Sequence, residues 1–138
     1  MQINQVMTPR CRTCNPSDSL RQAAQYMAQD DIGALPIAKD DHLVGMLTDR
    51  DIVTRGLASP RDINEFKTGD LMSDQVLYCY DDQKTDEVAR NMGELQIRRM
   101  PVVNREKQLV GMVSLGDLAS RGADDAAGEA LTDISEPG

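Results

Sequence analysis

Two short stretches of this chain share one pattern: LVGMLTDRD at residues 43–51 and LVGMVSLGD at residues 109–117. In each stretch, an apolar run that contains a glycine leads to a hydroxyl residue, and an aspartate follows three positions later. A short apolar run predicts a strand, and a hydroxyl residue with an acid three residues later predicts the first turn of a helix. The pattern therefore predicts the same strand-to-helix junction twice.

The repetition extends on both sides of these stretches. Val6-Met7-Thr8 corresponds to Leu71-Met72-Ser73 at an offset of 65 residues, and one extra residue in a turn of the second copy changes the offset to 66. Further matches are Cys14 with Cys79, Met27 with Met92, Ile32 with Ile97, Pro36 with Pro101 and Asp51 with Asp117. A copy of about fifty residues is marginally stable alone, so we expect each copy to bury its apolar face against the other.

Both copies predict the element order β-α-β-β-α. The proline inside the second predicted strand, at Pro36 or Pro101, removes a backbone donor and favours an edge or irregular position. The last helix of each copy is expected to end at Gly56 or Gly122, because glycine suits a helix C-cap. The predicted fold class is α+β: two pseudo-twofold-related β-α-β-β-α repeats packed through their sheets. Predicted boundaries are 1–57 for repeat 1, 58–70 for a linker, 71–122 for repeat 2 and 123–138 for a tail.

Composition excludes several classes of function. The chain has 138 residues and a net charge of -8, with 3% aromatic residues and one histidine, His42. An acidic, aromatic-poor chain is a poor nucleic-acid binder, and the apolar runs are too short to span a membrane. One histidine leaves little for histidine-based catalysis or metal binding, so we expect neither an enzyme nor a metal site. Residues 123–138 carry five acidic and no basic residues, which predicts a disordered acidic tail.

The paired motifs Thr48/Asp51 and Ser114/Asp117 allow two interpretations. As a capping box they satisfy the free N–H groups of a helix and imply nothing more. As a binding motif, the hydroxyl contacts a phosphate or ribose and the aspartate accepts from ribose hydroxyls. The nearby basic residues Arg50, Arg98 and Arg99 are either ordinary surface charges or partners for the phosphates of an anionic ligand.

The three cysteines, Cys11, Cys14 and Cys79, also have two interpretations. Cys14 and Cys79 are equivalent in the repeat, which favours small buried packing residues. The spacing of Cys11 and Cys14 leaves a redox switch or a weak metal role as the alternative. A complete zinc site needs more ligands than these residues supply. The odd cysteine count fits a reducing cytoplasm.

The repeated motifs resemble a tandem pair of CBS domains, named after cystathionine β-synthase, and are similar to small stand-alone bacterial proteins of the hypoxic-response type. The resemblance covers residues from about Ile3 to Gly122. It implies a Bateman module that dimerises and binds AMP, ADP, ATP, NAD or S-adenosylmethionine in clefts between the repeats. The ligand-binding positions that it implies, together with the basic residues above, are Thr13, Leu35, Pro36, Thr48, Arg50, Asp51, Tyr78, Arg98, Arg99, Met100, Pro101, Ser114 and Asp117.

The expected function is a non-enzymatic, cytoplasmic sensor of an adenine nucleotide, without a required cofactor. The expected partners are a second copy of the chain and a regulated protein, and not nucleic acid or a membrane. Two alternatives remain open: a dimerisation or interaction module with vestigial clefts, and a thiol-based redox switch.

Overall fold

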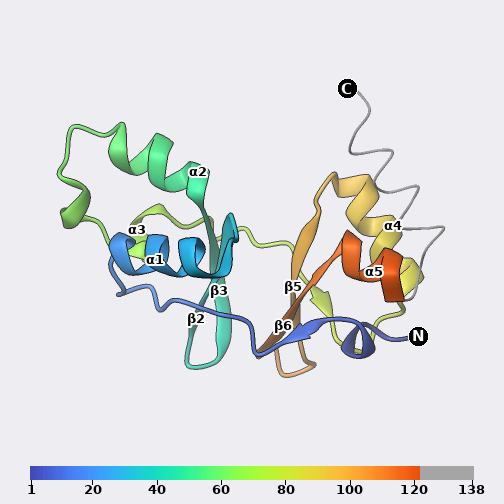
Figure 1. Ribbon diagram of the computed structural model, residues 1–138. Helices are drawn as coiled ribbons and strands as arrows, with labels where there is room; N and C mark the ends of the chain where they lie inside the picture. Colours follow the sequence, from blue (N-terminus) through green and yellow to red (C-terminus); the bar gives the residue numbers. More distant parts are fainter. Residues whose placement is uncertain (122–138) are drawn as a thin grey trace. The chain divides into compact units, whose positions relative to one another are not determined.

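The protein is described by a computed structural model, which describes residues 1–121 (Figure 1). Helices and short strands alternate along the chain, which confirms the predicted α+β class. The elements before residue 77 are η1 (Ile3–Gln5), β1 (Thr8–Pro9), α1 (Leu20–Asp30), β2 (Ala34–Lys39), β3 (His42–Thr48), α2 (Asp49–Asp51), η2 (Ile52–Leu57), η3 (Ile63–Glu65) and α3 (Thr68–Leu71). The elements after it are β4 (Cys79–Tyr80), α4 (Thr85–Leu95), β5 (Arg99–Val103), β6 (Leu109–Ser114) and α5 (Leu115–Arg121).

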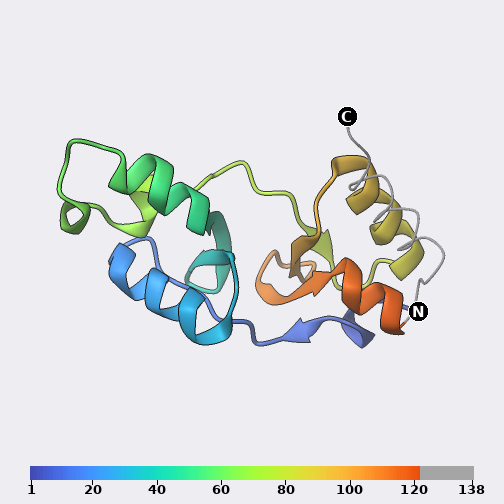
Figure 2. The same ribbon diagram turned by 45° about the horizontal axis from the view of Figure 1, so that its top comes forward.

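The chain forms two compact units that do not follow the order of the sequence. Unit 1 contains Met1–Cys11 together with the chain from Leu77 onward, and unit 2 contains Arg12–Val76. The start of the first copy is therefore part of the unit built around the second copy. Figure 2 shows this blue segment, with β1, running beside the orange and red elements of unit 1. The predicted tail at residues 123–138 lies outside the described residues.

Each unit is completed by a segment from the start of the other copy. In unit 1, β1 pairs antiparallel with β6, and Thr8 lies opposite Met112. In unit 2, Ser73 pairs with Met46 of β3 through two backbone hydrogen bonds of 2.8 and 2.9 Å. Thr8 and Ser73 are equivalent in the repeat, so the two copies exchange their first segments. Neither copy alone contains all the pairing strands of one unit.

Two equivalent glycines allow the exchanged segments to approach the hairpins. A Cβ atom on Gly111 would lie 2.6 Å from the carbonyl oxygen of Thr8. A Cβ atom on Gly45 would lie 2.5 Å from Sδ of Met72 and 2.9 Å from the carbonyl oxygen of Ser73. Such distances are shorter than real Cβ contacts, so any larger residue at either position would force a neighbouring group to shift. The glycine in each repeated apolar run therefore has a packing role.

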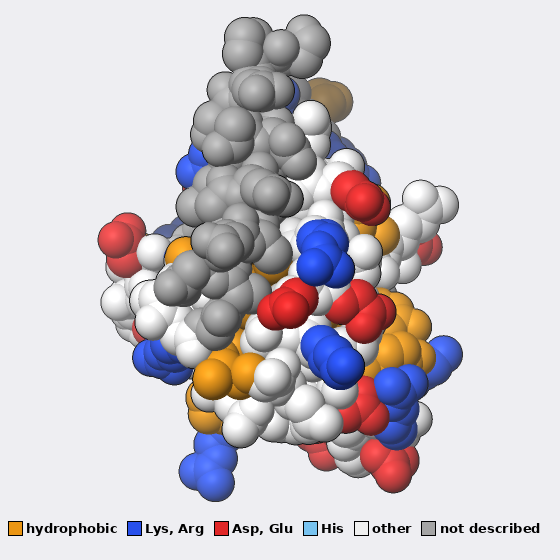
Figure 3. Space-filling view, turned by 90° about the vertical axis from the view of Figure 1, so that its right-hand side faces the viewer, with side chains coloured by type: hydrophobic (Ala, Val, Ile, Leu, Met, Phe, Trp, Pro, Cys, Tyr) orange, Lys and Arg blue, Asp and Glu red, His pale blue; other side chains and the backbone are white. Residues whose placement is uncertain are grey.

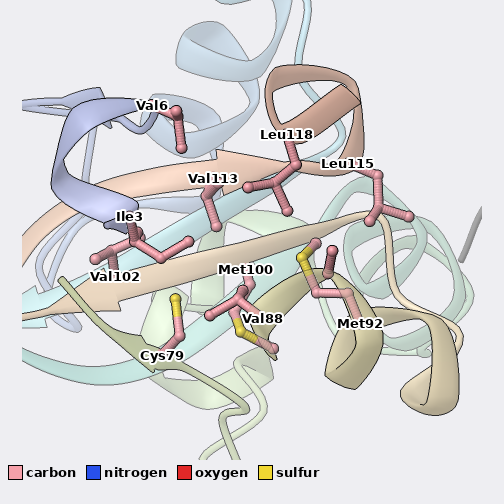
Figure 4. Packing of buried hydrophobic residues seen from close by; sticks show 11 residues of the cluster. Ile3, Val6, Cys79, Val88, Met92, Met100, Val102, Val113, Leu115 and Leu118 are labelled. Atoms are coloured by element: carbon pink, nitrogen blue, oxygen red, sulfur yellow. The ribbon is translucent and has the colours of Figure 1, made fainter. Parts of the chain in front are cut away.

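Unit 1 contains a four-stranded sheet in the order β1-β6-β5-β4, in which β4 is parallel to β5 and the other neighbours are antiparallel. Apolar side chains from η1, the sheet, α4 and α5 form one core (Figure 4). Its buried members are Ile3, Val6, Cys79, Val88, Ala89, Met92, Met100, Val102, Val113, Leu115 and Leu118.

Unit 2 is built on the hairpin of β2 and β3, with Cys14 pairing in parallel with Ile37 on the outer side of β2. Its core includes residues from α1, the hairpin and the chain that follows η2. The buried members are Cys14, Leu20, Ala23, Met27, Leu35, Ile37, Leu47, Phe66 and Leu71. The pairing of Cys14 with Ile37 repeats that of Cys79 with Val102 in unit 1, so the offset of 65 residues holds in three dimensions.

Helices α1 and α4 end in the same way. Each is followed by a residue in the left-handed conformation, Asp31 with φ 52° and Gln96 with φ 57°. These two residues also differ by 65 in number. At the start of α1, the hydroxyl of Ser19 accepts from the N–H of Gln22 at 3.1 Å, so Ser19 is the N-cap of this helix.

The proline of the second strand does not confine that strand to an edge in unit 1, because β5 lies between β6 and β4. The equivalent proline in β2 shows how this is possible. The carbonyl of Pro36 accepts from the N–H of Cys14 at 3.3 Å, so the backbone of this residue faces away from β3. The N–H that a proline lacks would also point away from β3, toward the segment of Cys14, which pairs with β2 only at a single bridge. The hydrogen bonds between β2 and β3 are therefore kept.

The last helix of the first copy also differs from the prediction. Helix α2 is a single turn that continues as the π-helix η2 up to Leu57, and Gly56 lies buried inside this turn rather than at its C-cap. A Cβ atom on Gly56 would lie 2.9 Å from Cδ1 of Ile63, so this glycine makes room for packing. Gly122 lies outside the described residues. Within residues 1–121, no helix has the length and apolar character needed to cross a membrane.

Candidate functional site

The two hydroxyl–aspartate pairs lie where a strand runs into a helix in each unit. In unit 2, the N–H of Asp51 donates to Oγ1 of Thr48 at 3.1 Å, and the N–H of Thr48 donates to Oδ2 of Asp51 at 3.0 Å. In unit 1, the corresponding distances between Asp117 and Ser114 are 3.0 and 3.3 Å. Both junctions are therefore reciprocal capping boxes, as the structural interpretation of the motif predicted.

Capping leaves part of each carboxylate available. Among the described residues, Asp51 and Asp117 use only Oδ2 in side-chain hydrogen bonds, and both side chains are half-buried. An ionised carboxylate has two acceptor oxygens. Oδ1 can therefore accept from another group while Oδ2 caps the helix, and the capping and binding interpretations are compatible.

In unit 1, the predicted binding residues gather at one end of the sheet. Strand β5 begins at this end and β6 ends there, and the chain that leads into β4 runs alongside the first part of β5, because β4 pairs in parallel with Val102 and Val103. Arg99 lies opposite Ser114 in the register, and Tyr78 comes directly before β4. Arg98 and Arg99 are exposed, and neither takes part in an ion pair among the described residues. Their guanidinium groups are therefore available to an anion at this end.

In unit 2, the equivalent end of the sheet has a different charge. Ala34 lies opposite Thr48, and the N–H of Asp49 donates to the carbonyl of Gly33 at 3.0 Å. The Asp49 carboxylate lies so close to Gly33 that a Cβ there would be 3.2 Å from its Oδ2. Arg50 follows on the surface, and Thr13 comes directly before Cys14. In unit 2 a carboxylate therefore lies beside Gly33, the position that Arg98 occupies in unit 1.

The predicted positions in the proline strands are buried. Leu35 is 0% exposed and Met100 is 3% exposed, and Pro36 and Pro101 are buried as well. Three of these residues belong to the interior of their units: Leu35, Pro36 and Pro101. The fourth, Met100, lines a cavity of unit 1 that is described next.

Unit 1 also contains a hollow of about 250 Å³ between α4 and the segment before β4. Two of the predicted residues, Tyr78 and Met100, line it. Leu77, Asn91 and Leu95 line it too, and they were not among the predicted residues, which lie at positions where the copies match. The two copies have different residues at these three positions, and this difference is the sequence signal that could have identified them as site residues.

The cysteine thiols are held in their protonated form. Burial and then the charge of Asp81 raise the pKa of Cys79 to about 12. Burial and then Asp18 raise the pKa of Cys14 to about 11, and burial also raises the pKa of Cys11. Because the thiolate is the reactive form, this environment disfavours the redox alternative. The described residues contain no cluster of three or more side chains suited to hold a metal ion.

Comparison with known proteins identifies the repeat. The model of the CBS domain family matches residues 3–58 and 69–124. Hypoxic response protein 1 of Mycobacterium tuberculosis is 48% identical over 103 residues, which are 74% of this chain and 71% of that protein. A structure of Hypoxic Response Protein I with two coordinated zinc ions superposes with a TM-score of 0.79 at 39% identity, covering 88% of this chain and 98% of that one.

Two similar structures contain adenosine derivatives. CBSX2 in complex with AMP has a TM-score of 0.76 at 26% identity, covering 90% of this chain and 97% of that one. The CBS domain pair of MJ0100, in complex with 5-methylthioadenosine and S-adenosyl-L-methionine, has a TM-score of 0.74 at 25% identity, covering 91% of this chain and 98% of that one. The two matched segments and these relatives show that the chain belongs to the CBS domain family and contains a tandem pair of CBS domains.

Proposed function

We propose that this chain is a non-enzymatic sensor that binds an adenosine-containing ligand. The proposal is supported by the similarity to CBSX2, whose structure contains AMP, and to MJ0100, whose structure contains 5-methylthioadenosine and S-adenosyl-L-methionine. These three ligands share an adenosine group. The candidate ligands are therefore AMP, ADP, ATP, NAD and S-adenosylmethionine.

The observation that carries the proposal is the free carboxylate oxygen beside each capping box. Ribose offers two neighbouring hydroxyl groups, and an aspartate can accept hydrogen bonds from both, as in dinucleotide-binding folds. Asp51 and Asp117 each keep Oδ1 available while Oδ2 holds the helix start. The hydroxyl groups of Thr48 and Ser114 lie in the same junctions and add further polar contacts.

The first experiment is a thermal-shift screen with the five candidate ligands. A ligand present at about 100 times its Kd stabilises the folded state by roughly 2.7 kcal/mol, which raises the melting temperature measurably. At least one candidate is expected to stabilise the protein at millimolar concentration. Absence of a shift with all five would contradict the proposal.

Two variants test the role assigned to the aspartates. Asp51→Asn and Asp117→Asn keep one oxygen for the capping hydrogen bond and replace the other with an amide that donates. We expect at least one of them to weaken ligand binding while the protein stays folded. Asp62→Asn is the matched control, because Asp62 also caps a helical turn, through Asn64 at 2.8 Å, away from both junctions. Unchanged affinity in both test variants would remove the ribose assignment.

The signal is proposed to pass through association with a second copy or a regulated protein. Val53 and Leu57 are 54% and 61% exposed, and they lie one turn apart on η2. Exposed apolar side chains at this spacing form a surface suited to protein contacts. We expect a Val53→Glu/Leu57→Glu variant to lower the mass of the particle measured by light scattering. If the wild-type chain binds no ligand yet remains associated, the interaction-module alternative is favoured. A cytoplasmic location also stays a prediction.

A further inference from the structure

The eight methionines of this chain fall into three groups by exposure. One of them, Met1, is 62% exposed. Three lie in the cores and are at most 6% exposed: Met27, Met92 and Met100. Four are half-buried: Met7, Met46, Met72 and Met112. Figure 4 shows two core methionines among the apolar side chains of unit 1, and Figure 3 shows that hydrophobic side chains, a class that includes methionine, also reach the surface of this unit.

Two of the half-buried methionines lie where the exchanged segments pack against the hairpins. A Cβ atom on Gly45 would lie 2.5 Å from Sδ of Met72, and one on Gly111 would lie 3.0 Å from Sδ of Met7. Met7 and Met72 are equivalent in the repeat, at the offset of 65 residues. Each also packs against the core of its unit. These two contacts, Met7 with Gly111 and Met72 with Gly45, are called the thioether contacts.

The other two half-buried methionines lie on the hairpins themselves. Met46 follows Gly45 in β3, and Met112 follows Gly111 in β6. Neighbouring side chains of a strand point to opposite faces of the sheet. The Met46 and Met112 side chains therefore lie on the face opposite to the one where a Cβ on either glycine would meet an exchanged segment. They form a matched pair of half-buried methionines in a different place.

A thioether can react with a hydroperoxide without losing a proton first, whereas a thiol must become a thiolate. The sulfur lone pair forms a bond to one oxygen of hydrogen peroxide while the O–O bond breaks. The proton on the transferred oxygen moves to the departing oxygen, which leaves as water. Sulfur is oxidised by two electrons to a sulfoxide, and the peroxide is reduced by the same two electrons. The burial that shields the three cysteines therefore does not protect the half-buried methionines.

The added oxygen changes both the size and the polarity of the side chain at the thioether contacts. A sulfoxide is polar, and burying a polar group against an apolar core without a hydrogen bond costs free energy. The space between each sulfur and its glycine is too small even for one more carbon atom without a shift. The Met72 sulfur lies closer to its glycine than the Met7 sulfur does, so we expect unit 2 to be the more sensitive unit.

We propose that Met7 and Met72 are paired oxidation sites at which a hydroperoxide loosens the exchanged segments from their hairpins. Unit 1 then loses the pairing of Thr8 with Met112, and unit 2 loses the two backbone hydrogen bonds between Ser73 and Met46. The change is reversible, because methionine sulfoxide reductases restore the thioether. It does not depend on ligand binding, so it adds a response to oxidants that stands or falls independently of the proposed function.

The first test treats the folded full chain with hydrogen peroxide and locates the added oxygen atoms by peptide mass spectrometry. A thiol reductant is then added, because it reverses disulfides and sulfenic acids of cysteine but not methionine sulfoxide. We expect Met1 to be oxidised first, the half-buried methionines next and the core methionines last. Oxidation of Met92 before Met7 and Met72 would overturn the inference.

Hydrogen exchange of backbone amides measures the expected loosening. In unit 2, the N–H groups of Ser73 and Met46 donate across the contact at 2.8 and 2.9 Å. Amides that open locally exchange at a rate set by the opening equilibrium. We expect these two amides to exchange about tenfold faster or more once Met72 is oxidised. Complete oxidation of Met72 with unchanged exchange at both amides would overturn the inference.

Two double changes separate the thioether contacts from the other half-buried methionines. Met7→Leu/Met72→Leu removes two sulfur atoms and keeps apolar side chains of similar volume, so peroxide is expected to leave the exchange of the contact amides unchanged. Met46→Leu/Met112→Leu is the matched control, and it is expected to respond to peroxide as the wild-type chain does. Equal protection by both double changes would overturn the assignment to the thioether contacts.

The deciding experiment reproduces the change without an oxidant and then reverses it. Met72→Gln places a polar, unbranched side chain at the contact of unit 2 and is expected to speed exchange at Ser73 and Met46. It is expected to leave unchanged the amide of Arg10, which donates to the carbonyl of Val110 in unit 1 at 3.4 Å. Met7→Gln is expected to have the opposite pattern. In the oxidised wild-type chain, methionine sulfoxide reductases are expected to restore slow exchange. Fast exchange that persists after both sulfoxides are reduced would overturn the inference.

Discussion

Units 1 and 2 have the same framework but different surfaces at equivalent positions. Both have a hairpin with a proline strand, a capping box and an exchanged segment held against a glycine. Their differences lie at a few positions: Arg12 against Leu77, Asp30 against Leu95, Gly33 against Arg98, and Asp49 against Leu115. The backbone is thus repeated, while side-chain substitutions change charge and open or fill a groove.

The largest expected difference between the units is at Leu115 and Asp49, which occupy the first position of α5 and α2. Leu115 is 1% exposed and belongs to the core of unit 1, so Leu115→Ala is expected to cost about 2–5 kcal/mol in the free energy of unfolding. Asp49→Ala changes an exposed residue and is expected to leave stability nearly unchanged. Urea denaturation of both variants measures the contrast. Similar losses would show that the two junctions are packed alike.

The next effect concerns the two glycines against which the exchanged segments pack. Gly111→Ala places a Cβ against the backbone of Thr8, and this overpacking is expected to cost about 1–3 kcal/mol. Gly45→Ala is expected to cost less, because the backbone oxygen that its Cβ would meet, that of Ser73, is 2.9 Å away rather than 2.6 Å, and the other close group is the side chain of Met72. Gly116→Ala is the control, since its Cβ would meet only Oγ of Ser114 at 3.6 Å, and alanine favours the helix. Denaturation curves that rank Gly116→Ala as the most damaging change would contradict this account.

A smaller, pH-dependent effect distinguishes the two buried thiols. The folded pKa is about 12 for Cys79 and about 11 for Cys14, both above the ordinary value of 9.0. The unfolded chain therefore releases these protons at lower pH than the folded protein. The protonated thiols therefore contribute to the free energy of unfolding fully below pH 9. This contribution is lost as the pH rises from 9 toward 11 for Cys14 and toward 12 for Cys79.

We expect Cys79→Ala to flatten the alkaline fall in stability more than Cys14→Ala does, measured by denaturation between pH 8 and 11. The two variants are compared by slope, because removing a buried side chain lowers stability at every pH. An alkaline slope that neither variant changes would contradict the assignment of this effect to the thiols.

The smallest effect on stability belongs to the Arg12 clasp, the contacts of the Arg12 guanidinium with the Asp30 carboxylate and the Tyr26 ring. The side chains of Arg12 and Asp30 are 39% and 34% exposed, so solvent and salt screen their pair. Asp30→Asn is expected to lower the melting temperature slightly in low salt, with a smaller difference at high salt. Asp82→Asn, which breaks the Arg105 pair at 2.7 Å in unit 1, is a matched control. A large, salt-independent loss for Asp30→Asn would show that the clasp supports the fold itself.

Much of the framework was predictable because local patterns determine it. The apolar runs at 43–47 and 109–113 became β3 and β6, and the hydroxyl–aspartate motifs became capping boxes. The exchange of first segments was not predicted, because the pairing of Thr8 with Met112 joins residues that are far apart in the sequence. The local sequence at Thr8 does not specify which hairpin it meets.

The candidate site was predictable only in part for a similar reason. Residues that match between the copies, such as Thr48 and Ser114, are visible in an alignment of the two halves. Arg12 and Asp30 are 18 residues apart, and only the turn that brings α1 back beside the first segment places them in contact. The sequence shows that the copies differ at Leu77, Asn91 and Leu95, but only the packed structure shows that these three residues line one hollow.

We expect the two units to differ in ligand binding although their backbones are alike, and the number of ligands bound per chain measures this difference. Calorimetric titration of the full chain with AMP measures the number of sites per chain. We expect one site per chain of measurable affinity, which is weakened by Arg98→Gly/Arg99→Ala. Two sites of equal affinity per chain would contradict it.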